Sequence, residues 1–419
     1  MRRIWLAVST TFAAKAFATS LDFATLVITA HLLGPAGRGA IATTLAWATL
    51  LASVFNMSLG QVSARRLMGG GRNRLRTTLS SLSMLGLMLS LAAWLTVAMF
   101  ELLIGVSIGP LLLIAALAIA PLIIFDFYVS HLLSVSDHLS TYNVAQIIGR
   151  CAGFSGTLVG LFILNAGVLA PLTGMFLALL ISITIGSRKL LRMSGGIERP
   201  HRSEVVSLFS DGLKLHLNTL GSFMLFQADV VLLGQLRPLE EAGWYQSAFQ
   251  LIGVPILLPT VVTHVLYSKM GRQTPNQVWL TQKALLGPIM LGLGLVAMFG
   301  SVFANEIIGL LFGIDFLPAV PAFRILMLSM VGIGFSQLMV TQWIARGYFL
   351  LAGGLTLSLA LISVLLNLLL IPGYGYLASA WISAGTFFLV ILSNMGLIVH
   401  IERQLVSETG PLPPPSVQS

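Results

Sequence analysis

Long apolar stretches separated by short polar segments follow one another along most of the 419-residue chain. A helix needs about 20 mainly apolar residues to cross the hydrocarbon core of a membrane. The stretches are continuous and do not alternate as the strands of a membrane β-barrel would. The pattern therefore predicts an all-α integral membrane protein with about 12 transmembrane helices. These helices are expected at residues 9–33, 38–62, 78–102, 107–129, 142–164, 167–187, 208–235, 241–267, 280–304, 317–341, 348–371 and 374–400.

The composition agrees with this interpretation, because 56% of the residues are hydrophobic and only 9% are charged. Soluble proteins have about 25% charged residues. Cys151 is the single cysteine, which excludes an intramolecular disulfide framework and a cysteine metal site. The sequence has no Walker A motif, no His/Cys/Asp cluster with metal-ligand spacing and no carboxylate pair suited to hydrolysis. We therefore expect neither an enzyme nor a protein with a cofactor or metal.

Basic residues gather on alternate loops. If the N-terminus is cytoplasmic, the inside segments hold 17 of the 23 Lys and Arg residues, and the outside loops hold only Arg38 and Arg237. The positive-inside rule then places both chain termini in the cytoplasm. It also explains the formal charge of +9 without a nucleic-acid partner.

The two halves of the chain resemble each other. The segment HLLGPAGRG at 31–39 has a counterpart about 200 residues later in VLLGQLRPLEEAGWY, and NAGVLAPL at 165–172 resembles PGYGYLASA at 372–380. Six helices per repeat give a parallel repeat with its axis along the membrane normal, as in transporters that bind substrate between two lobes. We expect a V-shaped molecule with a central cavity, an N-terminal six-helix lobe with a basic linker at 1–206, a C-terminal lobe at 207–402 and a Pro-rich cytoplasmic tail at 403–419.

Several ionisable residues fall inside the predicted spans, where they are costly and tend to face a bundle interior or a wet cavity. Lys15 and Asp22 are seven residues apart and so share one helix face, about 10 Å apart along the axis. Lys214 lies near the repeat-related position, and Arg150 ends a polar stripe on its helix. These three cations would form a positive funnel that attracts an anion. The remaining candidates are the acids Asp126 and Asp229, the titratable His216, and Arg324.

Structural alternatives exist for some of these residues. Lys214 could extend to lipid phosphates at the membrane surface. Arg324 could be an interfacial anchor or a strut, and Asp126 could pair with a neighbouring helix.

Four segments resemble the polysaccharide flippases of the multidrug/oligosaccharidyl-lipid/polysaccharide exporter superfamily. They are LGPAGRGAIATTLAWATLLASVFNMSLGQVSARR (33–66), DVVLLGQLRPLEEAGWYQSAFQLIGVPILLP (229–259), LFGIDFLPAVPAFRILML (311–328) and LLNLLLIPGYGYLASAWIS (365–383). The matching positions include Leu33, Gly34, Pro35, Gly39, Asn367, Ile371, Pro372, Gly375 and Ala378. Their order and spacing are more specific than any one of them.

The resemblance implies a transporter that moves undecaprenyl-pyrophosphate-linked oligosaccharide across the bacterial inner membrane, next to a polysaccharide polymerase and glycosyltransferases. Lys15, Lys214 and Arg150 would then bind the pyrophosphate. Asp22 or Asp229, with Asp126 and His216 as further candidates, would exchange protons or pair with charges. Trp244 and Tyr245 would contact sugars or belong to the interfacial belt. Twelve spans rather than fourteen argue against the lipid II flippase subgroup.

Two alternatives remain. A multidrug cation antiporter of the same superfamily would need an acidic cavity, whereas the charges within the spans are mainly positive. A non-transporting scaffold of a polysaccharide assembly complex would tolerate neutral residues at these positions.

Overall fold

The computed structural model describes residues 2–67, 72–103, 105, 109–135, 139–270 and 274–409, and every regular element within them is a helix. This confirms the predicted all-α fold. The helices are α1 (Arg2–Phe55), α2 (Leu59–Leu67), α3 (Arg72–Leu103), α4 (Pro110–Val135), α5 (Leu139–Phe162), α6 (Leu169–Ser194), α7 (Arg202–Leu236), α8 (Leu239–Met270), α9 (Pro275–Val302), α10 (Ala304–Phe312), the 3-10 turn η1 (Ile314–Phe316), α11 (Ala319–Ala345), α12 (Phe349–Tyr374) and α13 (Tyr376–Thr409).

Eleven helices among the described residues are long and apolar enough to cross a membrane, and the first of them contains two crossings. The 54 residues of α1 would be about 80 Å long if straight, more than twice the hydrocarbon thickness. The chain reverses at Gly34, whose φ of 64° is accessible to glycine at little cost, and Pro35 starts the second half. Counting α1 as two crossings gives the predicted twelve.

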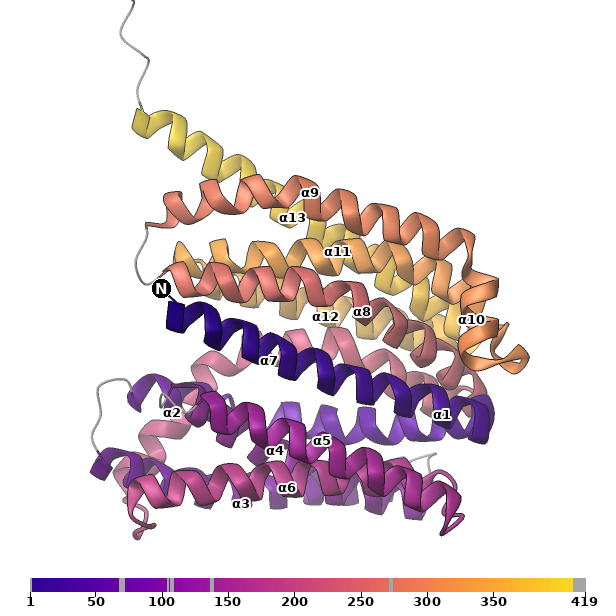
Figure 1. The fold of residues 1–419 in the computed structure, drawn as a ribbon, viewed down its shortest axis with the longest axis horizontal. Coiled ribbons are helices and arrows are strands. Elements are labelled where there is room, and N and C mark those ends of the chain that lie inside the picture. Colours follow the sequence, from indigo (N-terminus) through magenta and orange to yellow (C-terminus); the bar gives the residue numbers. More distant parts are fainter. Residues whose placement is uncertain are drawn as a thin grey trace, which may run out of the picture.

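The helices form two groups that meet along α1 (Figure 1). Helices α1–α6 pack mainly among themselves, and so do α7–α13, while α1 also packs against α7 and α8. We call these sets the N-terminal group and the C-terminal group. Helix α13 continues to Thr409, so the first residues of the predicted tail extend this helix, and residues 410–419 lie outside the described part.

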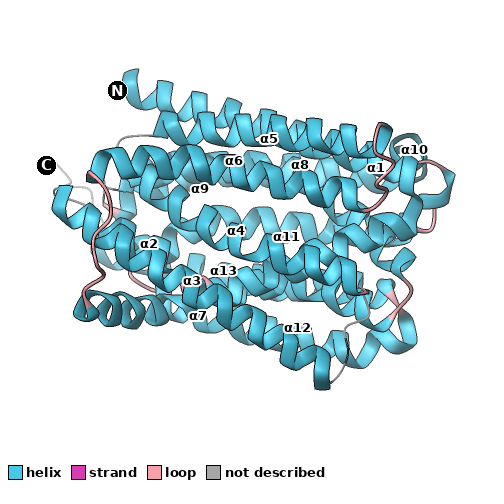
Figure 2. Cartoon of the chain, turned by 90° about the horizontal axis from the view of Figure 1, so that it is seen from below, coloured by secondary structure: helices cyan, strands magenta, loops and turns pink. Residues whose placement is uncertain are grey.

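The start of α1 and the end of α13 lie at the same end of the bundle (Figure 2), as an even number of crossings requires. We call this end the terminal face. The opposite end, which holds the Gly34 reversal and α10, is the far face. The predicted orientation would make the terminal face cytoplasmic.

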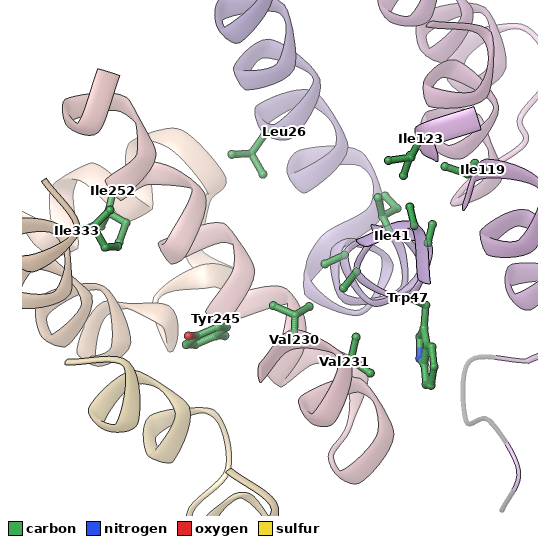
Figure 3. Packing of buried hydrophobic residues seen from close by; sticks show 14 of the residues in the cluster. Leu26, Ile41, Trp47, Ile119, Ile123, Val230, Val231, Tyr245, Ile252 and Ile333 are labelled. Atoms are coloured by element: carbon green, nitrogen blue, oxygen red, sulfur yellow. The ribbon is translucent and has the colours of Figure 1, made fainter. Parts of the chain in front are cut away.

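Buried apolar side chains join the two groups. Figure 3 shows side chains of α1, such as Ile41, between Ile119 of α4 and Val231 of α7. At the far face, α1 and α8 approach through glycines: a Cβ on Gly39 would overlap the carbonyl oxygen of Leu239, and one on Gly243 would overlap that of Pro35. Small residues permit such close approach between membrane helices.

A polar contact joins the groups at the terminal face. Arg66 of α2 donates hydrogen bonds to Glu204 at 3.1 Å and to Asp211, both on α7. Nearby, Ser58 donates to Thr219 at 2.9 Å. The contact is partly exposed, and the hydrogen bond from Arg66 holds the pKa of the Asp211 carboxyl below its usual value.

The α2–α7 contact should therefore weaken in acid. Because the pKa of Asp211 is lower in the folded protein, the contact stabilises the fold above about pH 4, and this stabilisation is lost as the pH falls through the folded pKa. Thermal unfolding of wild type and Arg66→Gln, followed from neutral to acidic pH, should converge at the acidic end. Lys214→Gln is the matched control, because Lys214 pairs with the same carboxylate at 3.5 Å but is 74% exposed. A constant difference between wild type and Arg66→Gln at all pH values would contradict this prediction.

Candidate functional site

A cavity of about 280 Å³ lies where α1, α5 and α6 face α7 and α8. Its apolar lining comes mostly from the N-terminal group. Its polar lining includes Asp22, Arg38, Arg150, Gln227, Gln246 and Gln250. Two cations, one carboxylate and three amides therefore point into a space between the two groups.

An ion pair occupies the wall of this cavity. Nη1 of Arg150 on α5 lies 3.0 Å from Oδ1 of Asp22 on α1. Behind it, Asp126 of α4 accepts a hydrogen bond from Ser182 at 3.0 Å, and Asp126 and Arg150 line the same small pocket. Arg150 thus lies between two carboxylates from different helices, which the sequence did not pair with it.

The two predicted lysines do not line this cavity. Lys214 is exposed, and its Nζ lies 3.5 Å from Oδ1 of Asp211, one turn earlier on α7. This position favours the alternative in which Lys214 reaches the membrane surface. Lys15 is half-buried on α1, two turns nearer the terminal face than Asp22.

Asp229 lies in the C-terminal group, away from the cavity lining. Its carboxylate is buried and accepts hydrogen bonds from the Tyr245 hydroxyl and from the backbone N–H of Val230 at 2.8 Å. Tyr245 is 0% exposed, and its hydroxyl oxygen also lies 3.2 Å from the Ser383 hydroxyl oxygen. The expectation that Tyr245 contacts sugars is therefore wrong, because its ring is enclosed between α7, α8 and α13. The ring of Trp244 donates to the Asp315 carbonyl at 3.0 Å.

Removing the Tyr245 hydroxyl should destabilise the fold. In Tyr245→Phe the buried Asp229 carboxylate loses its side-chain donor, a loss that costs about 1–3 kcal/mol for a buried polar group. The variant should unfold at lower temperature in detergent, while Tyr348→Phe, whose hydroxyl lies at the exposed His400 ring, should resemble wild type. Equal unfolding temperatures for all three proteins would show that this hydrogen bond contributes little.

The two remaining predicted residues lie elsewhere. His216 is buried on α7 beside the Val54 backbone. Arg324 is exposed on α11, and its Nε donates to the Ser301 carbonyl at 3.1 Å, which fits the strut alternative.

Arg38 is the cavity residue that the sequence interpretation missed. The hydropathy pattern predicts it in an outside loop, yet it is only 4% exposed and lies inside the second half of α1. Its Nη1 donates to Thr29 and its Nη2 to Gln250, both at 3.1 Å. The Gly34-Pro35 pair was the available signal, because a proline at the first helical position leaves no loop before residue 38.

A second cavity of about 230 Å³ lies within the C-terminal group, between α7, α11, α12 and α13. Its described lining has no charged side chain; the polar groups are those of Gln337, Trp343, Asn394 and several hydroxyl residues. Of these two cavities, only the first has charged side chains among its described lining residues.

Comparisons with known proteins agree with this architecture. Residues 4–270 match the family model described as polysaccharide biosynthesis protein. No curated protein matches the chain.

Solved transporters share the fold at low sequence identity. The lipid II flippase MurJ in an inward closed conformation matches with a TM-score of 0.76 and 15% identity over 92% of this chain and 87% of that chain. An inward-facing multidrug resistance MATE family transporter of the MOP superfamily matches with a TM-score of 0.69 and 14% identity over 92% and 96% of the two chains. A MOP superfamily transporter from Pyrococcus furiosus, described as having a binding pocket of reverse polarity, matches with a TM-score of 0.61 and 14% identity over 94% and 96%.

The family model covers more than half of the chain, and the structural matches extend over both helix groups. This protein is therefore a multi-pass membrane protein of the polysaccharide biosynthesis protein family, with the fold of the MOP superfamily transporters.

Proposed function

We propose that this protein translocates undecaprenyl-pyrophosphate-linked oligosaccharide across the bacterial inner membrane by alternating access. The proposal rests on one observation above all: the cavity between the helix groups is lined by two guanidinium groups, one carboxylate and three amides. A cationic site suits a pyrophosphate, and amides suit sugar hydroxyls. The cavity volume is close to the lower end of the range of about 300–1,000 Å³ for small-molecule sites, so it suits a head group.

Transport would require the two groups to separate at one face at a time. Two contacts would have to open in turn. They are the close α1–α8 approach at the far face and the Arg66 contact with α7 at the terminal face. With the predicted orientation, substrate would enter from the cytoplasmic side, after glycosyltransferases have completed the oligosaccharide. A polysaccharide polymerase would act on it only later.

Within the cavity, Arg150 would bind the pyrophosphate first. To do so, its guanidinium would exchange the ion pair with Asp22 for one with the ligand. Asp22 and Asp126 suit proton coupling better than Asp229 or His216, because they flank Arg150 whereas Asp229 is held by Tyr245. Protonation of Asp22 would free the guanidinium for an anion. Lys15 and Lys214 would attract the pyrophosphate earlier, near the terminal face.

A proteoliposome assay tests the proposal. Undecaprenyl-pyrophosphate-linked oligosaccharide is placed in the membrane, and exposure of the glycan to an external glycosidase is followed with time. Wild type should expose it, and Arg150→Gln should expose it at least about tenfold more slowly, since the loss of a charged hydrogen bond of about 1.5–3 kcal/mol corresponds to such a factor. Arg188→Gln, on the exposed surface of α6, is the matched control and should resemble wild type.

Other outcomes distinguish the alternatives. Wild type that moves none of several glycans but expels organic cations would support a multidrug antiporter. Wild type that moves neither would favour a scaffold. Loss of transport in both Lys15→Gln and Lys214→Gln, with correctly folded protein, would add the two lysines to the substrate path.

A further inference from the structure

Arg38 differs from the other cation of the cavity in its partners. Arg150 is paired with Asp22, whereas none of the ion pairs among the described residues includes Arg38. Its hydrogen-bond partners are a hydroxyl and an amide, and its Nε has no partner in the described structure. A buried guanidinium is therefore hydrogen-bonded but not neutralised, although charges inside membrane proteins are normally paired.

The surroundings of Arg38 are suited to a ligand that carries both acceptor oxygens and hydroxyl donors. The guanidinium lines the cavity together with Gln246 and Gln250 of α8. The side-chain oxygen of Gln246 is buried and has no hydrogen-bond partner in the described region either. Donor and acceptor groups with unused capacity thus face the same space.

Arg38 lies deeper toward the far face than Arg150. Its guanidinium contacts Thr29, which is seven residues beyond Asp22 on α1 and so about 10 Å farther along the helix axis. The cavity therefore has two cationic groups in succession along the membrane normal: Arg150 at the level of Asp22, and Arg38 near the far face.

We propose that Arg38 binds a phosphate group at the far-face end of the cavity, and that Gln250 holds the position of a phosphate oxygen until the ligand arrives. The planar guanidinium can bind two phosphate oxygens at once, which one amide oxygen cannot imitate. The identity of the ligand as a lipid-linked pyrophosphate rests on the proposed function, but phosphate recognition by Arg38 does not.

Phosphate binding at Arg38 would also affect the motion between the two helix groups. The Arg38–Gln250 hydrogen bond also joins the N-terminal group to α8, and Arg38 is the residue before Gly39 on α1. A phosphate that displaces Gln250 removes this bond, so arrival of the head group would favour separation at the far face.

Ligand binding to the full-length protein in nanodiscs tests the assignment. The probes are inorganic pyrophosphate, farnesyl pyrophosphate and neutral farnesol, measured by calorimetry at fixed salt. Farnesyl pyrophosphate should bind wild type, and Arg38→Gln should weaken its binding at least tenfold, with Arg38→Lys intermediate. Gln250→Ala should bind farnesyl pyrophosphate a few-fold more tightly than wild type, because the phosphate no longer competes with the amide.

Arg237→Gln is the matched control, because Arg237 is an arginine at the far face that pairs with Glu241 outside the cavity. The inference is overturned if wild type binds neither pyrophosphate probe, if Arg38→Gln binds as wild type does, or if Gln250→Ala weakens binding as much as Arg38→Gln. Binding of inorganic pyrophosphate equal to that of farnesyl pyrophosphate would identify a free-anion site.

Two further results separate this inference from the proposed function. If Arg38→Gln does not fold, Arg38→Lys and Gln250→Ala still decide it, since they keep the buried charge and predict opposite changes in affinity. Arg38-dependent pyrophosphate binding without glycan transport would reject the flippase proposal and keep the inference. Glycan transport that is unchanged in Arg38→Lys and Arg38→Gln would reject the inference alone.

Discussion

Replacing Gly39 with alanine is expected to prevent closure of the far face and to slow transport at least about tenfold. The added Cβ would overlap the backbone carbonyl of Leu239, and a backbone atom in a packed helix cannot rotate away as a side chain can. Overpacking of this kind costs about 1–3 kcal/mol, and 1.4 kcal/mol already corresponds to a factor of ten. The glycosidase-exposure assay and thermal unfolding in detergent measure the two effects.

Gly253→Ala is the matched control for this change. Gly253 also lies on α8, but a Cβ there would meet no atom within 4 Å. The variant should transport as wild type does and unfold at the same or a slightly higher temperature, because alanine favours the helix. Wild-type transport by Gly39→Ala would mean that the close α1–α8 approach is not part of the transport cycle.

Neutralising either partner of the Asp22–Arg150 pair is expected to impair transport strongly, and the two changes should not be additive. Arg150→Gln leaves Asp22 without its ion-pair partner and removes the cation that lines the same small pocket as Asp126, so it should be the more harmful change. Asp22→Asn leaves Arg150 beside Asp126. The Asp22 side chain is 52% exposed to the cavity, so water screens the pair, and we expect a coupling energy of about 1 kcal/mol.

A double-mutant cycle of Asp22→Asn and Arg150→Gln measures this coupling by thermal unfolding, with the transport assay run in parallel. Lys283→Gln, which breaks the exposed Lys283–Glu402 pair, provides a matched control for an ion pair outside the cavity. Additive losses in the double variant would mean that the two side chains act independently despite their 3.0 Å separation.

The fold could be predicted from the sequence because hydropathy acts locally. Each apolar stretch is long enough to cross the membrane whatever its neighbours are, so twelve crossings could be counted one by one. The Gly34-Pro35 reversal was also readable, since both residues specify the local backbone by their own geometry. Element ends differ by a few residues, and α13 continues into the segment assigned to the tail.

The candidate site could be predicted only in part. Asp22 and Arg150 were both recognised as buried charges, but their pairing across 128 residues depends on how α1 and α5 pack. The repeat relates Lys214 to Lys15 and so predicts it in the cavity, yet its exposed side chain pairs with Asp211 and does not line the cavity. Tyr245 was expected at an outer mouth, and helix packing encloses it beside Asp229 instead.

The sequence by itself determined that this is a polytopic helical membrane protein with charged residues inside its spans, because the cost of burying charge in lipid is set by residue type and depth. Only the tertiary structure decided which of these charges share a cavity. The Gly34-Pro35 pair places Arg38 inside a helix, but Arg38 becomes a cavity residue only because helix packing brings Gln250 of α8 to meet it. Helix rotation and packing fix such meetings, and they depend on contacts between residues far apart in the chain.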